Sequence, residues 1–400
     1  MWIGCLESDS EFERKAKKGA KLASAQVSQA NIISGIESLT GLCFDSVNGS
    51  VLPPYPAYED RDIEPVVWSH KDKSFDISVG YRNDKYINRV NCRIAMVKAV
   101  RDWVKRRYKG GKLTAIAYSM RSAPMAAAAE LKRLVPEARI FLIITDLPQF
   151  MDLGQSKLKA FLKRIDGIGI KRMQGKFDGF ILYAEKMARA LDIPKPKYLV
   201  MEGSFDASEL KAPKTGKKTK AIMYSGTLDM QYGIDLLLKA FMSVEDADAQ
   251  LWLTGGGNAV EYIKDCAARD SRIHFFGFLP SRAEVLDKQA QAAALVNMRL
   301  PSEVASAYCF PSKLFEYMAS GTPVLSFALE GIPEEYYEHL VMINDESTAA
   351  VRAAIERVLD MDAEAAARIG DGAKRFVTEK KNTAAQCGRI CAWLGIGAGE

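Results

Sequence analysis

The stretch CFPSKLFEYMASGTPVLSF, residues 309–327, decides how the second half of this chain is interpreted. An apolar helical pattern ends at a Gly-Thr-Pro break, and the apolar run Val324–Phe327 follows it. Glu316 lies in the middle of this pattern, and Lys313 lies about one turn before it. Burying either charge without a partner is costly. The two groups therefore either pair with each other for structural reasons or hold a polar ligand.

Short β-rich runs alternate with helical stretches on both sides of this segment. The strands predicted in the second half are 221–224, 250–254, 273–276, 294–297, 322–327 and 340–343, with helices over 232–243, 259–269, 282–289 and 347–359. Those predicted in the first half are 113–117, 140–145, 179–183 and 198–201, and only residues 2–6 could form a first strand. Such alternation implies parallel sheets covered on both faces. We therefore predict an α/β fold with two doubly wound, Rossmann-like domains.

The length of 400 residues suits two domains of about 150–200 residues each. The segment 206–220 is polar, rich in lysine and contains proline and glycine, so we expect a solvated linker there. The predicted domains are then residues 1–205 and 221–382. A final helix is expected from about residue 383, and the segment 383–400 could pack back on the first domain.

The composition is that of a globular protein, with 48% hydrophobic and 26% charged residues. We find no run of the roughly 18 apolar residues that a membrane span needs. The N-terminus turns acidic after six residues, which argues against a secretory signal. The seven cysteines form no CxxC pair and the three histidines are far apart, so we expect reduced thiols, a cytoplasmic location and no metal site.

Charge is distributed unevenly between the two halves. Residues 1–206 hold 34 Lys and Arg against 24 Asp and Glu, a net charge of +10, whereas the rest hold 21 against 26, a net of −5. A basic first half suggests an anionic partner there, for which nucleic acid, an acidic membrane surface or a phosphorylated substrate would fit.

Three further segments place glycine directly after a predicted strand. They are YSGTLDMQYGIDLLLKAF (224–241), LWLTGGGNAVEYI (251–263) and FFGFLPSRAEV (275–285). Glycine at such a point lets the backbone approach a ligand closely. Each loop alone is best explained as a plain tight turn, but three of them together with residues 309–327 favour a nucleotide site.

The charges in the opening segment can now be interpreted. Ser312 is predicted to cap a helix, whose N-terminal N–H groups and dipole would favour a diphosphate. Lys313 would add a positive charge, and Glu316 could accept hydrogen bonds from a cis-diol such as ribose. The structural alternative is a local Lys313–Glu316 ion pair, worth a few tenths of a kcal/mol on a surface. The apolar neighbours on both sides favour the ligand site.

The segment PSKLFEYMASGTPVL (311–325) resembles the donor-site signature of GT-B glycosyltransferases, specifically of retaining glycosyltransferase family 4. The three glycine-containing segments are similar to the motifs of the same family, in the family's order, so the resemblance covers about 221–345. The first half matches only through ITDLPQF (144–150) and the helix-rich segment after it. The resemblance implies the GT-B fold, in which residues 1–205 bind the acceptor and residues 221–382 bind a nucleotide sugar.

The resemblance also implies roles for the residues that match. Glu316 would bind the donor ribose, Arg299 and Lys313 would contact the donor diphosphate, and Asp146 would lie near the transferred sugar or the acceptor. The other implied donor-site residues are Phe310, Ser312 and Leu314 in the turn beside the donor, Gly277, Phe278 and Leu279 in the loop at the base, and Gly226 and Thr227 facing the diphosphate.

The sequence also departs from the family pattern. Many members hold the diphosphate with an arginine and a lysine at two positions that are Thr227 and Tyr232 here. We hypothesise that Arg299 and Lys313 replace this missing clamp. Tyr308 stands where the second acidic residue of the family's E-x7-E motif would fall.

The expected reaction is the transfer of a sugar from a nucleotide diphosphate sugar to a hydroxyl of a glycan or of a polyprenyl-pyrophosphate-linked acceptor, in the synthesis of cell-surface polysaccharide or glycoconjugate. The family implies retention of configuration. Neither a cofactor nor a metal is expected, and the donor substrate is expected to be a UDP-sugar, with a GDP-sugar as the alternative.

A basic amphipathic pattern over 156–178 would suit an anionic membrane surface at the inner face of the membrane. Its cations singled out as contacts for the acceptor or membrane are Lys157, Lys163, Arg164, Lys171 and Arg172. A helix that packs its apolar face on the sheet and leaves its lysines in solvent would explain the pattern equally well.

Three other functions remain open. The missing clamp would suit a non-catalytic nucleotide-sugar-binding subunit of a transferase complex. A sugar-nucleotide epimerase of the same fold would need acid and base side chains, for which three histidines offer little. A nucleic-acid binder is disfavoured because we find no motif of interleaved aromatic and basic residues.

Overall fold

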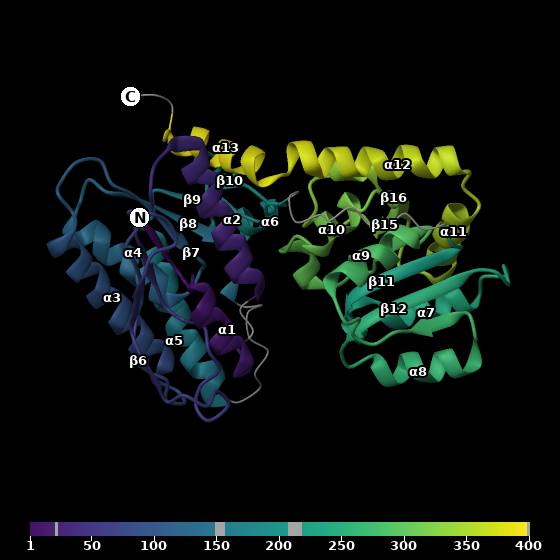
Figure 1. Cartoon of the computed structure of the whole chain (residues 1–400), viewed down its shortest axis with the longest axis horizontal. Helices are drawn as coiled ribbons and strands as arrows, with labels where there is room; N and C mark the ends of the chain where they lie inside the picture. Colours follow the sequence, from purple (N-terminus) through teal and green to yellow (C-terminus); the bar gives the residue numbers. More distant parts are fainter. Residues whose placement is uncertain (21–22, 149–156, 207–217, 398–400) are drawn as a thin grey trace. The chain divides into compact units, whose positions relative to one another are not determined.

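The computed structural model describes residues 1–20, 23–148, 157–206 and 218–397, and it leaves the side chains of residues 23, 24 and 157–165 undescribed. The chain forms two compact units (Figure 1). The first comprises Met1–Tyr183, Met187–Met201 and Cys387–Glu400, and the second comprises Ala184–Lys186 and Glu202–Gln386. Most of the predicted linker, residues 207–217, lies outside the described residues.

The second unit is built on a six-stranded parallel sheet (Figure 1). Its strands are β11 (Ala221–Thr227), β12 (Gln250–Gly256), β13 (Ile273–Phe275), β14 (Ala294–Asn297), β15 (Val324–Phe327) and β16 (Val341–Ile343). They lie in the order β13-β12-β11-β14-β15-β16. The chain therefore winds outward from β11 in one direction and then in the other. The direction changes between β11 and β14, and in doubly wound sheets ligands bind beyond the carboxyl ends of the strands at such a switch point.

Continuous apolar runs explain why these segments form central strands. All four residues of β14 and of β15 are buried, as are the first five residues of β11. A parallel strand with helices on both faces has no solvent side, so it needs no polar alternation. The helices of this unit are α7 (Ile234–Met242), α8 (Val260–Arg269), α9 (Arg282–Gln291), α10 (Lys313–Ala319), α11 (Thr348–Leu359) and α12 (Ala363–Arg375).

The first unit contains an eight-stranded sheet. Its strands are β1 (Trp2–Gly4), β2 (Ser46–Asn48), β4 (Val66–Trp68), β5 (Asp76–Ser78), β7 (Thr114–Tyr118), β8 (Arg139–Ile144), β9 (Gly179–Leu182) and β10 (Tyr198–Val200), in the order β10-β9-β8-β7-β1-β2-β5-β4. Only β4 pairs antiparallel within this sheet. A separate two-stranded sheet pairs β3 (Asp62–Ile63) with β6 (Tyr81–Arg82). The winding changes direction between β1 and β7, so both units share one topological plan.

Helices cover both faces of the first sheet. They are α1 (Asp9–Lys17), α2 (Ala23–Thr40), α3 (Asn88–Arg106), α4 (Ser122–Leu134), α5 (Lys157–Gln174), α6 (Glu185–Ala190) and α13 (Thr383–Leu394). From α13, Ile390 and Leu394 join Trp2 and Ile32 in one buried cluster, and Cys387 Sγ donates to the Ile32 carbonyl oxygen at 3.6 Å. The end of the chain thus completes the core of the first unit. No helix in the described ranges has the length and hydropathy of a membrane span.

Two of the sequence-based expectations can be examined directly. The alternation of strands and helices predicted the α/β fold with two parallel sheets, and this prediction is confirmed. All seven cysteines are free thiols in the structure. The strands β2, β4 and β5 were not predicted, because they lie between α2 and α3, where no helical pattern separates one short strand from the next.

Candidate donor site

The loop that follows β11 is pressed against the end of β14. Gly233 has a φ of +74°, and a Cβ added there would lie 2.7 Å from the carbonyl oxygen of Met298, directly after β14. Only glycine fits this backbone without strain. The Asp229 side chain accepts a hydrogen bond from Gln231 N and so caps the short turn before Gly233. At the switch point, the backbone of the loop after β11 therefore packs directly against the backbone that follows β14.

The glycine loop after β12 is joined to the same place. Gly255 has a φ of +129°, and a Cβ there would lie 1.9 Å from the carbonyl oxygen of Gly226. Gly255 N also donates to the carbonyl oxygen of Gly277 at 2.8 Å, and Leu228 N donates to that of Gly256 at 3.0 Å. The three glycine-containing segments of the sequence therefore meet at one edge of the sheet.

Glu316 lies on α10, and 14% of its side chain is exposed. Its Oε1 accepts hydrogen bonds from Gln289 Nε2 at 2.9 Å and from Lys313 Nζ at 3.1 Å. Its Oε2 lies 3.9 Å from Arg282 Nε. The carboxylate is therefore paired with Lys313, as expected if the two charges form a local ion pair. It also accepts a hydrogen bond from a neutral side chain, Gln289, which the sequence did not indicate.

That partner belongs to a buried network that reaches β11. Gln289 Nε2 donates to Ser225 Oγ at 2.9 Å as well as to Glu316. Tyr317 OH donates to the carbonyl oxygen of Ser225 at 2.7 Å and accepts from Ser225 N at 2.9 Å. Burial raises the pKa of the Tyr317 hydroxyl, so it stays a neutral donor. Glu316 is thereby linked to the carboxyl end of β11.

The start of α10 differs from its prediction. Ser312 precedes the helix, but its side chain makes no capping hydrogen bond, so the predicted cap is wrong. Its backbone is already helical, with φ −54° and ψ −28°, whereas a capping serine needs an extended backbone. The side chains of Phe310 and Leu314 belong to the hydrophobic core, and Leu314 N donates to the carbonyl oxygen of Pro311 at 2.8 Å. Ser312 and Lys313 are exposed.

Arg299 follows β14 on the other side of the switch point. Its guanidinium lies over the ring of Tyr232, 5.0 Å from the ring centroid, and its NH1 donates to Cys309 Sγ at 2.8 Å. Burial raises the pKa of Tyr224, the fourth residue of β11, to about 12, and the nearby Arg299 charge acts in the opposite direction. Arg299 and Glu316 are thus both held near the end of β11.

The structure shows what the three residues that depart from the pattern of the resemblance contact. Tyr232, which the resemblance places at a lysine position, has its ring under the Arg299 guanidinium. The ring centroid of Tyr308, which the resemblance places at the position of the second acidic residue, lies 5.4 Å from Lys186 Nζ. Thr227, which the resemblance places at an arginine position, is the exposed last residue of β11, and its carbonyl oxygen accepts a hydrogen bond from Tyr224 OH at 2.8 Å.

The loop after β13 contains the residues predicted to contact the base. Gly277 has a φ of +62°, and its carbonyl oxygen accepts from Thr254 Oγ1 at 2.7 Å. Phe278 is 82% exposed, and its ring lies so close to Gly256 that an added Cβ there would approach it to 2.7 Å. Leu279 is half-buried. This loop therefore presents an aromatic ring to solvent beside the glycine loop of β12.

The remaining predicted residues belong to the first unit. Asp146 is exposed two residues after β8. Lys171 and Arg172 are exposed near the end of α5. The side chains of Lys157, Lys163 and Arg164 lie outside the described part of the structure.

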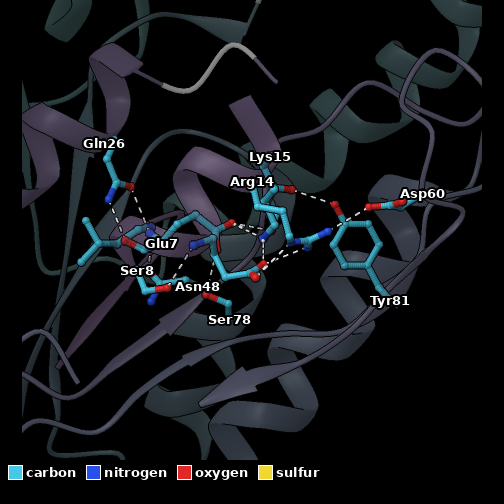
Figure 2. A network of polar contacts seen from close by, with 12 residues as sticks. Glu7, Ser8, Arg14, Lys15, Gln26, Asn48, Asp60, Ser78 and Tyr81 are labelled. Carbon is cyan, nitrogen blue, oxygen red and sulfur yellow. Dashed lines mark hydrogen bonds and ion pairs between the residues drawn. The ribbon is translucent and has the colours of Figure 1, made fainter. Parts of the chain in front are cut away.

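The carboxyl edge of the first sheet carries a buried polar network, drawn in Figure 2. Lys15 Nζ and Glu7 Oε1 lie 2.8 Å apart, with exposed fractions of only 1% and 0% for the two side chains. Lys15 also donates to Ser50 Oγ at 2.8 Å, and Ser78 Oγ donates to Glu7 Oε2 at 3.0 Å. Both charges are compensated inside the protein, so we interpret this network as structural.

In the loop after β1, side chains accept hydrogen bonds from the backbone N–H groups. Cys5 N donates to Gln29 Oε1 at 3.0 Å, Leu6 N to Asn48 Oδ1 at 2.9 Å and Glu7 N to Gln26 Oε1 at 3.0 Å. Three consecutive N–H groups at the switch point of the first sheet are therefore satisfied within the unit.

Comparison with known proteins supports the assignment of the second unit. Residues 219–361 match the family described as "Glycosyl transferases group 1". Glycogen synthases of Thermus caldophilus and Thermus thermophilus are 27% identical over 179 residues, which cover 42% of this chain. The match spans about 39% of the length of these relatives.

Solved structures match over nearly the whole chain. Anabaena HepE in complex with UDP gives a TM-score of 0.63 at 11% identity and covers 98% of this chain and 99% of its own. The lipopolysaccharide outer core galactosyltransferase WaaB gives 0.65 at 12% identity, covering 98% of each chain. A trehalose-6-phosphate synthase gives 0.66 at 10% identity, covering 99% of each. The chain therefore has the GT-B fold, and its residues 219–361 match the group 1 glycosyl transferases.

Proposed function

We propose that the protein is a glycosyltransferase that moves a sugar from a nucleotide diphosphate sugar to a hydroxyl of a glycan or lipid-linked acceptor. The observation that carries the proposal is the placement of one carboxylate and one guanidinium, Glu316 and Arg299, near the carboxyl end of β11. The GT-B fold and the family match over 219–361 support it.

In the proposed site, Glu316 accepts hydrogen bonds from the donor ribose. Arg299 faces the diphosphate from the end of β14, and Lys313, which is 49% exposed, reaches it from α10. Negative charge gathers on the diphosphate as the bond to the sugar breaks, and fixed cations stabilise a charge that develops in the transition state. Tyr232 supplies no charge itself but holds Arg299 in place.

The stereochemical outcome and the role of Asp146 complete the proposal. The resemblance to family 4 favours retention of configuration, with attack of the acceptor on the face that the diphosphate leaves and with the leaving phosphate as base. Asp146 is exposed in the first unit, where it would orient the sugar or the acceptor. Gly226, Thr227 and Ser312 would contact the diphosphate, and Gly277, Phe278 and Leu279 would contact the base.

A UDP-sugar is the proposed donor. HepE was solved with UDP and with UDP and glucose, and a trehalose-6-phosphate protein from E. coli was solved with UDP-2-fluoro glucose. A GDP-sugar is the alternative donor. The proposed acceptor is a glycan or a polyprenyl-pyrophosphate-linked sugar of polysaccharide synthesis in the cytoplasm.

A lipid-linked acceptor would bring the first unit to an anionic membrane surface. On α5, the exposed Lys171 and Arg172 favour this contact, and further described residues that favour it lie at the start of α3 and directly before it. Tyr86, Ile87, Val90 and Ile94 are 53%, 48%, 53% and 62% exposed. Arg93, Lys98 and Lys105 are exposed along the same helix. Apolar side chains next to cations suit the interface of an anionic bilayer.

The membrane contact can be tested with phosphatidylglycerol-containing and phosphatidylcholine vesicles. The protein should float only with the anionic vesicles, and the Val90→Glu/Ile94→Glu variant should stay in solution. Val67→Glu is the matched control, because Val67 is 61% exposed on β4, away from α3. Equal flotation of the two variants would remove α3 from the proposal.

The reaction itself is tested by calorimetric titration with UDP, GDP and their sugars, followed by a transfer assay on glycan and lipid-linked acceptors. UDP-sugar binding together with turnover is the expected result. Binding with no turnover on any acceptor would favour the non-catalytic subunit, which the missing arginine and lysine of the clamp make the second candidate. Absence of nucleotide binding would overturn both.

A further inference from the structure

Gln289, the eighth residue of α9, is fully buried and has one unsatisfied polar atom. Its Nε2 lies 2.9 Å from both Ser225 Oγ and Glu316 Oε1. Its Oε1 is buried and has no hydrogen-bond partner among the described residues. A buried carbonyl left without a partner destabilises a protein. If this side chain only filled space in the core, methionine or leucine would stabilise the protein more. The amide group therefore needs another explanation.

The orientation of this amide is determined by the charge it faces. The reversed orientation would direct the carbonyl oxygen of Gln289 at a carboxylate oxygen of Glu316, which is electrostatically unfavourable. The other contacts hold the residue in place. The main-chain oxygen of Gln289 accepts from Thr322 Oγ1 at 3.0 Å, and Ser225 is itself held by Tyr317. The Nε2 donor is therefore fixed relative to β11.

The two partners of Glu316 Oε1 differ in how easily they can leave. Lys313 is 49% exposed and can move into solvent, whereas Gln289 is enclosed on all sides. A carboxylate accepts about four hydrogen bonds in total, two at each oxygen. If Lys313 moves towards a diphosphate, Oε1 regains one acceptor site, and among the described residues the nearest partner of Oε2 is Arg282 Nε at 3.9 Å. One hydroxyl of a cis-diol could then bind at each oxygen.

We propose that Gln289 is a positioning residue, which holds the Glu316 carboxylate in the rotation that presents both oxygens to the ribose diol of the donor. The proposal rests on the proposed function, because it assumes that Glu316 meets the ribose. Fixing the carboxylate in advance lowers the entropy that donor binding would otherwise cost. Gln289 itself need not touch the nucleotide.

The decisive variant is Gln289→Met, which keeps the length of the side chain and removes the amide. UDP should bind to it about 5–20-fold more weakly than to the wild type, which corresponds to roughly 1–2 kcal/mol. Its urea midpoint should be unchanged or raised, since the unsatisfied carbonyl is gone. The same comparison is made with 2′,3′-dideoxy-UDP, to which wild type and variant should bind equally, because this nucleotide has no diol for Glu316 to meet.

Gln250→Met is the matched control. Gln250 lies at the amino end of β12, where its Oε1 accepts from Trp252 Nε1 at 2.8 Å, and its substitution should leave UDP binding unchanged. Should Gln289→Met not fold, Gln289→Asn keeps the amide but shortens its reach, and the same pattern of binding is expected from it.

The possible failures are distinguishable. If the wild type does not bind UDP, or if Glu316→Ala binds UDP as well as the wild type, the proposed function fails first. If Glu316→Ala weakens UDP binding and Gln289→Met does not, the positioning role is wrong. It is equally wrong if Gln289→Met weakens UDP and dideoxy-UDP by the same factor, which is the result expected of general damage to the unit.

Discussion

The carboxyl edges of the two sheets share a winding but differ in how their charges are used. In the first unit, Glu7 and Lys15 are paired at 0% and 1% exposure, and three consecutive N–H groups after β1 donate to side chains of the same unit. In the second unit, Glu316 retains 14% exposure, Lys313 is 49% exposed, and Arg299 rests on an aromatic ring and a thiol.

This difference shows why a shared fold does not place equal sites at equal positions. A buried ion pair must be fully compensated, or it destabilises the protein by several kcal/mol. Charges that are compensated in this way and are as fully buried as Glu7 and Lys15 have no accessible hydrogen-bonding capacity for a ligand. The second edge holds its charges with partners that either are neutral or can move, so it retains that capacity.

Among substitutions that test this difference between the two edges, Glu7→Ala should have the largest effect, a loss of stability. It removes the closest counter-ion of the buried Lys15 ammonium and leaves Glu11 Oε2, 3.7 Å away, as the remaining one. The free energy of unfolding should therefore fall by about 3 kcal/mol, the lower end of the range for a broken buried ion pair. Urea unfolding followed by tryptophan fluorescence reports mainly on the first unit, which holds Trp2, Trp68, Trp103 and Trp393. Lys313→Ala is the control and should change stability by less than about 1 kcal/mol. Similar losses in both variants would mean that the edges do not differ.

The next effect concerns Arg299. Arg299→Ala should lower the transfer rate by about 10²–10³-fold, the usual result of removing one group that stabilises developing negative charge. In the double variant Arg299→Ala/Tyr232→Lys, a lysine stands where the resemblance implies one, and part of the rate should be recovered. Lys264→Ala, at an exposed cation of α8, is the control. A rate unaffected by Arg299→Ala would show that this charge is structural, like those of the first unit.

Glu316→Ala should weaken UDP binding by about 1.5–3 kcal/mol, the contribution of a hydrogen bond to a charged group. The unit should remain folded, because Gln289 keeps its bond to Ser225. Calorimetric titration measures the affinity, with Glu261→Ala as the control at an exposed ion pair. Unchanged affinity would return Glu316 to a purely structural pair with Lys313.

The smallest effect is expected at the amino edge of the first sheet. His70 Nδ1 lies 2.7 Å from Asp76 Oδ2, and this hydrogen bond raises the pKa of His70 above 6.5. Stabilisation by the charged His70 is therefore complete below pH 6.5 and is lost as the pH rises through the raised pKa. Because His70 is partly exposed, His70→Asn should cost at most about 1 kcal/mol at pH 5.5 and less at pH 8.5. Urea unfolding at the two pH values measures the difference, and a larger loss at pH 8.5 would contradict the prediction.

The extent to which the structure could be predicted differs between the units for a physical reason. β14 begins and ends at the predicted residues; all four of its residues are buried and three are apolar, as is usual for a central parallel strand. The strands β2, β4 and β5 were missed, because no helix lies between them and the alternation of strands and helices that revealed the other strands is absent there. In the site, Glu316 stood out as a charge in an apolar helix, whereas Gln289 did not, because a glutamine on a charged helix has no visible anomaly.

The sequence by itself determined the α/β class, the two sheets, the glycine loops and the charges of the candidate site, since these depend on local pattern and on residue type. Only the tertiary structure decided which charges are buried against partners of the same unit and which can still form hydrogen bonds with a ligand. The Gln289–Glu316 and Tyr232–Arg299 contacts join residues 27 and 67 positions apart in the chain. Such pairs form only when the sheet brings its loops together, because hydrogen bonds and ring contacts depend on distance in space and leave no periodic trace in the sequence.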